Sequence, residues 1–165
     1  MPQSTSRRIR SGFRELPAFD RRGRDRGTVL TVPPPDVGSL APWAFQSRRV
    51  EKPWGHELIW ALSELYCGKM LFVRAGHSLS LQYHEQKDES WLIQAGLARI
   101  ELGAVGDETL AEEVVGPGAT FRYRPGTVHR ITAVEDTTIL EVSTPHLDDV
   151  VRLADSYGRE GTSAP

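Results

Sequence analysis

Three polar side chains between positions 76 and 96 have the types and spacing of metal ligands. Gln82 and His84 are two residues apart, and Glu89 follows five residues after His84. Residues i and i+2 of a strand project to the same face, so Gln82 and His84 point into one space if 78–84 is extended. Imidazole, carboxylate and amide oxygen are all ligands of divalent cations. The segment therefore predicts half of a metal site.

The elements that must position these groups are predicted to be β-strands. In 78–84, apolar residues alternate with the polar set Ser80, Gln82 and His84. A polar face on a central strand indicates that the strand lines a cavity. In 89–93, Glu89 shares its side with Trp91 and Ile93, which places this carboxylate at the edge of an apolar interior.

From position 48 onward the sequence pattern is typical of an all-β domain. Turn residues separate short β-prone segments, and no convincing helix interrupts them. The predicted strands are 56–61, 66–74, 78–84, 90–94, 97–102, 109–115, 120–123, 129–134 and 138–143. This pattern favours an antiparallel sandwich or a small barrel.

The first 47 residues differ in composition from the rest. They are rich in Arg and Pro, so we expect a mostly disordered or extended arm at 1–47, with a possible edge strand at 27–32. A folded domain at 48–159 and a disordered tail at 160–165 complete the expected organisation. Eight arginines against three acidic residues in positions 1–26 give +5, so a total of −2 leaves −7 on the remainder. Such an acidic domain is a poor non-specific nucleic-acid binder.

Cysteine usage and hydropathy bear on the compartment. The single cysteine, Cys67, excludes an internal disulfide, and we expect it to be a small buried residue. No apolar run approaches the roughly 18 residues that a membrane span requires. We expect a soluble, cytoplasmic protein that does not bind membranes.

A fourth ligand is expected near a later turn, because Gln82, His84 and Glu89 leave a metal under-ligated. His129 meets this expectation, since it follows the turn Pro125-Gly126. Arg124 precedes a proline and is biased to extended geometry, and Gly126 can adopt a positive φ. This turn can direct His129 back across the sheet.

With these two halves in order, the sequence resembles the cupin superfamily. The first cupin motif is matched by Gly76, Gln82, His84, Glu89 and Gly96, with Gln82 in place of the first histidine. The second is matched by Gly118, Gly126 and His129, with Arg124 in the usual proline position. The resemblance implies a double-stranded β-helix, also called a jelly-roll barrel, and pairing of two copies through their outer sheets.

Within cupins, the sequence resembles the type II mannose-6-phosphate isomerase domain. The likeness covers about 48–159 and rests on Gln82 and on the segments 52–55, 80–84, 148–153 and 155–159. There are two departures from that type. Residues 85–88 read Glu-Gln-Lys-Asp where that type has His-His-Arg, and we expect no nucleotidyltransferase domain before the region. The resemblance implies one divalent ion (Zn, Mn, Fe or Ni) on Gln82, His84, Glu89 and His129, and interconversion of an aldose phosphate and a ketose phosphate.

The cations that would hold the substrate phosphate are expected to be Lys87 and Arg159. Each can equally be an ordinary charge, Lys87 in solvent and Arg159 paired with Asp155. The proton-transfer group is left open between Lys87, Tyr83 and Glu141, of which Tyr83 should face away from the ligands.

Two other functions remain open. One is a non-catalytic cupin that binds a sugar or nucleotide sugar, and the other is a different metal-enabled reaction such as an oxygenase. Three further histidines have no ligand spacing and are expected on the surface or in loops: His56, His77 and His146. Three tryptophans are expected to pack in the core or under a lid: Trp54, Trp60 and Trp91.

Overall fold

The computed structural model describes residues 45–160, which form eleven strands and no helix. The strands are β1 (Arg48–Lys52), β2 (Gly55–Leu62), β3 (Cys67–Val73), β4 (Leu81–Tyr83), β5 (Glu89–Ala95), β6 (Ala98–Ala104), β7 (Ala111–Val115), β8 (Thr120–Tyr123), β9 (Thr127–Ala133), β10 (Thr137–Ser143) and β11 (Val151–Ala154). The all-β class is confirmed, and each predicted strand overlaps one of these. β1 and β11 were not predicted. The expected strand at 27–32 lies outside the described residues, as do positions 1–44 of the expected arm at 1–47 and positions 161–165 of the expected tail at 160–165.

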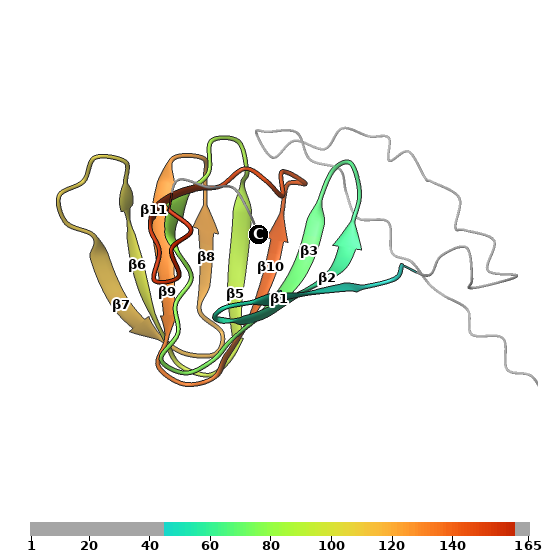
Figure 1. Cartoon of the computed structure of the whole chain (residues 1–165), viewed down its shortest axis with the longest axis horizontal. Coiled ribbons are helices and arrows are strands. Elements are labelled where there is room, and N and C mark those ends of the chain that lie inside the picture. The colour runs from blue at the N-terminus through green and yellow to red at the C-terminus, as the bar shows by residue number, and fades with distance from the viewer. Residues whose placement is uncertain (1–44, 161–165) are drawn as a thin grey trace, which may run out of the picture. The chain divides into compact units, whose positions relative to one another are not determined.

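The strands form two antiparallel sheets. The six-stranded sheet has the order β1-β2-β3-β10-β5-β8, and the five-stranded sheet has the order β11-β4-β9-β6-β7. Figure 1 shows β1, β2 and β3 toward one end of the domain and β6 and β7 toward the other. Chain-distant strands are neighbours in both sheets, since β10 lies between β3 and β5 and β9 lies between β4 and β6. This interleaving is what brings 82–89 and 129 together.

The interior between the sheets is divided into a packed part and a hollow part. Side chains of both sheets form one apolar cluster, which includes Val73, Ile93 and Ile139 from one sheet and Ile100 and Ile131 from the other. The hollow part is a cavity of about 550 Å³. It is lined by residues of β1, β2, β3, β4, β5 and β10 and of the segment 147–159.

The strand that carries Gln82 is shorter than predicted. Ser78 makes an isolated bridge to Thr132, and regular pairing begins only at Leu81. The predicted alternation is wrong at Leu79, because Leu79 and Ser80 are both buried and both line the cavity. The polar set of the strand does line a cavity, as predicted.

The expectation that all three tryptophans pack inside is wrong for Trp60. Trp54 and Trp91 are buried, whereas Trp60 is 47% exposed. Ile59 projects inward, so the next residue of β2 projects outward, and the Trp60 ring covers Gly68 on the outer face of the sheet. Cys67 is buried, as predicted, with a free thiol.

Residues 45–160 contain no helix that would be able to cross a lipid bilayer.

Candidate metal centre

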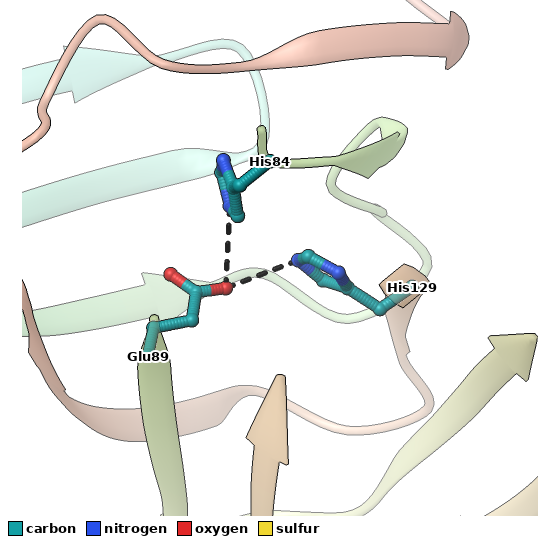
Figure 2. Close-up of side chains that lie close together, drawn as sticks. All are labelled: His84, Glu89 and His129. Carbon is teal, nitrogen blue, oxygen red and sulfur yellow. Dashed lines mark ion pairs between the residues drawn. The ribbon is translucent and has the colours of Figure 1, made fainter. Parts of the chain in front are cut away.

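Two imidazoles and one carboxylate converge inside the domain. His84 Nε2 lies 3.4 Å from Glu89 Oε1, and His129 Nε2 lies 3.1 Å from the same oxygen. Figure 2 shows both rings directed at this one carboxylate oxygen. The three ligand atoms lie within 4.8 Å of one another, and the three residues are at most 3% exposed.

Strand pairing explains the convergence. Glu89 opens β5, whose interior face continues with Trp91 and Ile93 as predicted. His129 lies on β9, which the turn 124–127 introduces, and Gly126 has a φ of 82° as its role in that turn requires. His84 follows β4, the neighbour of β9.

The second nitrogen of each imidazole is fixed by a backbone carbonyl. His84 Nδ1 donates to the carbonyl of Asp149, and His129 Nδ1 donates to the carbonyl of Thr127 at 3.0 Å. With the proton on Nδ1, each Nε2 presents a lone pair toward Glu89. Metal-bound histidines have this arrangement, because a bond from the other nitrogen sets the tautomer and the ring orientation.

The three ligand atoms fit a divalent cation. Among the described residues, His84 Nε2, Glu89 Oε1 and His129 Nε2 are buried and have no hydrogen-bond partner. A buried polar atom without a partner costs free energy, and three that face one point cost more. Burial raises the pKa of Glu89, but the ammonium of Lys87 opposes it, and that pKa lies well below its usual range. The carboxylate is therefore ionised and suited to a cation.

Gln82, the fourth predicted ligand, lies in the same region. It is the cross-strand partner of His129 and lines the cavity. Its Oε1 accepts a 2.6 Å hydrogen bond from Ser80 Oγ. The hydroxyl orients the amide, and a second lone pair of this oxygen stays available.

Aromatic rings pack around His129. The Tyr123 ring stacks on the imidazole with centroids 4.3 Å apart, and the Trp91 ring meets it edge-on at 5.5 Å. Burial raises the pKa of Tyr123, and the charge of Glu89 raises it further, so the phenol stays neutral. The two rings restrict the imidazole to one orientation.

Asp149 is a positioning residue that the sequence did not single out. Its carboxylate accepts hydrogen bonds from three consecutive backbone N–H groups, those of Glu85 at 3.0 Å, Gln86 at 2.7 Å and Lys87 at 2.7 Å. Its carbonyl receives the His84 bond described above. Burial raises the pKa of Asp149, but these N–H donors outweigh it, and the pKa lies below its usual value. One residue thus holds both His84 and the loop that leads to Glu89.

Lys87 is buried and lies between two carboxylates. Its ammonium donates to Glu89 Oε2 and, at 2.8 Å, to Glu141 Oε1. Burial lowers the pKa of Lys87, but Glu141 and Glu89 outweigh it and raise the pKa above its usual value. Glu141 faces the interior with Ile139 and Ser143 and lines the cavity.

Arg159 reaches the same cavity from the C-terminal segment. It makes a two-point ion pair with Asp155, with N···O distances of 2.8 and 3.1 Å, and its guanidinium lies over the Tyr157 ring. The predicted partner Asp155 is therefore present, and the cation still lines the cavity.

The three histidines without ligand spacing lie away from the cluster. His56 stacks on Phe72, and His77 stacks on Tyr157. His146 is exposed and contacts the Thr144 hydroxyl. None belongs to the group of described residues that can hold a metal.

A two-sheet β-fold with His84, Glu89 and His129 directed inward is that of a cupin. Its likeness to solved structures supports this class, since the capsular polysaccharide assembling protein CapF from Staphylococcus aureus superposes with a TM-score of 0.61 at 15% identity, over 71% of this chain and 34% of that chain. At this identity the likeness concerns the fold alone. Residues 43–155 match the model of the mannose-6-phosphate isomerase C-terminal family, and the chain belongs to this family.

Curated relatives are larger proteins of sugar metabolism. The chain is 34% identical over 118 residues to a mannose-1-phosphate guanylyltransferase of Escherichia coli K12, which covers 68% of this chain and 23% of that protein. It is 30% identical over 118 residues to the xanthan biosynthesis protein XanB of Xanthomonas campestris strain B100, over 68% and 24% of the two chains. The chain spans about a quarter of the length of these relatives.

Proposed function

We propose that this chain is a metal-dependent isomerase that interconverts an aldose phosphate and a ketose phosphate. Gln82, His84, Glu89 and His129 would hold one divalent ion, of which Zn, Mn, Fe and Ni all suit the mixed N and O ligands. Such an ion stabilises negative charge that develops on the sugar oxygens during the reaction.

The observation that carries this proposal is the set of three buried ligand atoms without hydrogen-bond partners, beside a cavity whose lining includes lysines and arginines as well as carboxylates. A structural metal needs no cavity next to it. Here His84, Glu89 and Gln82 line a space of about 550 Å³, which is within the range of small-molecule sites. The family model and the relatives support a sugar as the ligand.

Glu141 is the group we assign to proton transfer. Isomerisation moves one proton from C2 to C1 of the aldose and one from the hydroxyl O2 to O1, so no other reactant is consumed. A general base must be ionised and face the substrate. Glu141 lines the cavity, and Lys87 holds its carboxylate beside Glu89. Glu141 would take the C2 proton and return it to C1.

Lys87 and Arg159 then have different roles. The ammonium of Lys87 is engaged by Glu89 and Glu141, so we assign it to positioning these carboxylates. Arg159 lies in the segment 155–159 and lines the cavity. Of the two predicted phosphate-binding cations, Lys87 and Arg159, we assign only Arg159 to the substrate phosphate.

The test combines elemental analysis with an isomerase assay on mannose, glucose and related phosphates. We expect about one divalent ion per chain, and His84→Ala should lose both the ion and the turnover. His146→Ala, which removes an exposed histidine, is the matched control and should retain both. Turnover that survives complete metal removal would refute the proposal. Metal without conversion of any sugar phosphate, together with ligand-dependent thermal shifts, would favour a non-catalytic sugar-binding cupin.

We further propose a cytoplasmic homodimer that pairs through the outer face of the six-stranded sheet. Cross-strand register aligns Met70, Leu140 and Leu92 on this face, and Trp60 and Val142 are exposed beside them. Contiguous exposed apolar side chains of this kind mark interaction surfaces. Sedimentation velocity should show a dimer that Val142→Glu weakens, and an unchanged monomer in both proteins would contradict this assignment.

A further inference from the structure

The distribution of lysines in this chain is uneven. The sequence contains three lysines among 20 basic residues, and the rest are arginines. All three, Lys52, Lys69 and Lys87, line the one cavity beside the metal ligands. A lysine ammonium is a compact point charge with three donors, and it is a common partner of phosphate.

Two of these lysines form a cluster that is separate from the metal centre. Lys52 Nζ lies 3.2 Å from Glu57 Oε1, and Lys69 Nζ lies 3.3 Å from Glu57 Oε2. The three side chains are at most 13% exposed. Two ammonium groups share one carboxylate, so the cluster retains one positive charge toward the cavity. A buried excess charge is unfavourable unless a counter-charge arrives.

A further carboxylate of the cavity, Glu141, is the cross-strand partner of Lys69, but the ammonium of Lys87 already binds it. Burial lowers the pKa of Lys52, Glu57 opposes this, and Lys69 and Arg159 lower the pKa further. Burial raises the pKa of Glu57, but Lys69 and Lys52 outweigh it, so the pKa lies below its usual value and the carboxylate is ionised. Arg159 thus adds to the positive field at this end of the cavity.

The distance between the lysine cluster and the metal ligands suits a small ligand that extends from one to the other. Lys69 is the cross-strand partner of Glu141 on β10, and Ser143 of β10 is the partner of Glu89 on β5. Two strand spacings of about 4.8 Å therefore separate β3 from β5, or roughly 10 Å across the sheet. The metal ligands form the acidic end of this interior, and the lysine pair forms the basic end.

We infer that Lys52 and Lys69, held by Glu57, form the seat of a phosphate monoester whose sugar extends toward Glu141 and the metal ligands. This inference rests on the proposed function for the identity of the sugar but not for the anion. The shared carboxylate keeps both ammonium groups in place and is small enough to leave donors for the phosphate oxygens. Arg159 completes the positive end.

The experiment measures binding rather than turnover. Isothermal titration of the purified protein with inorganic phosphate, mannose 6-phosphate and mannose separates the anion from the sugar. Lys52→Met and Lys69→Met each remove one charge-assisted bond and should weaken binding of both phosphates about 10- to 100-fold. Glu57→Gln removes the competing negative charge but keeps an amide oxygen that accepts from the lysines, so it should strengthen phosphate binding. Arg99→Met removes an exposed charge on β6 and should leave the affinity within about twofold.

The opposite signs make the outcome decisive even if one lysine variant does not fold. Weaker binding in a lysine variant, or tighter binding in Glu57→Gln, with unchanged Arg99→Met supports the seat. Equal phosphate affinity in every variant that folds would overturn it. If phosphate binding depends on the lysines but the protein has no isomerase activity, only the proposed function is refuted. If the protein is an isomerase but phosphate binding does not depend on the lysines, only this inference is refuted.

Discussion

Replacement of Asp149 by alanine is the most informative single perturbation of the metal centre. Its carboxylate accepts three backbone N–H bonds from the loop that joins His84 to Glu89, and no other side chain of the described residues accepts from these three groups. The Asp149 backbone carbonyl that holds His84 survives the substitution, but the loop that aligns the two segments loses its anchor.

The magnitude follows from the burial of the three donors. Glu85 and Gln86 are exposed, so their N–H groups regain water and each lost bond costs about 0.5–1.5 kcal/mol. Lys87 is buried, and an N–H group left without a partner there costs about 1–3 kcal/mol. We expect Asp149→Ala to lower the free energy of unfolding by about 2–6 kcal/mol. Because a ligand-positioning group is lost, it should also lower the metal affinity by about 10- to 100-fold.

Denaturant unfolding and metal titration measure these two quantities. The pKa of Asp149 is lowered in the folded protein, so its stabilisation is fully present above the ordinary value of 3.8 and is lost as pH falls through the folded-state pKa. The stability difference between wild type and Asp149→Ala should therefore shrink in strong acid. Asp148→Ala removes the neighbouring exposed charge and should change stability by less than about 0.5 kcal/mol. If both variants unfold alike and bind metal alike, Asp149 does not organise this site.

Three further outcomes are expected. Gly96→Ala places a Cβ 2.2 Å from the Asp136 carbonyl oxygen at a backbone φ of 88°. It should destabilise the fold far more than Gly106→Ala, where φ is 94° and the added Cβ meets open space. Equal thermal shifts of the two variants would argue against this contact. Ser80→Ala removes the 2.6 Å bond to Gln82 and should weaken metal binding without loss of secondary structure; an affinity equal to wild type would mean that the hydroxyl does not orient the amide. Lys69 and Lys52 hold the pKa of Glu57 below 4.5, so its contribution to stability should be present above that pH and disappear as pH falls through the folded-state pKa. The free energies of unfolding of wild type and Glu57→Gln should therefore become equal in acid. A difference that stays constant with pH would refute this.

The sequence predicted the strands well where turn chemistry marks their ends. β8 was predicted at its observed bounds, because Gly118 precedes it and Pro125-Gly126 follows it. β1 and β11 were missed because neither has a full apolar alternation. β1 pairs only with β2, and β11 pairs with β4 across the intervening segment 84–150, which no local pattern shows.

What the sequence alone determined was the set of candidate ligands. Period-2 alternation places Gln82 with His84 and Glu89 with Trp91, and the Pro125-Gly126 turn locates His129, since strand geometry acts over a few residues. Only the tertiary structure decided which charges surround them. Asp149 reaches His84 over 65 positions of chain and Lys87 reaches Glu141 over 54, whereas Glu57 reaches Lys69 across the adjacent strands β2 and β3. Such partners depend on burial and on opposite charge in the folded protein, so residue spacing along the chain does not predict them.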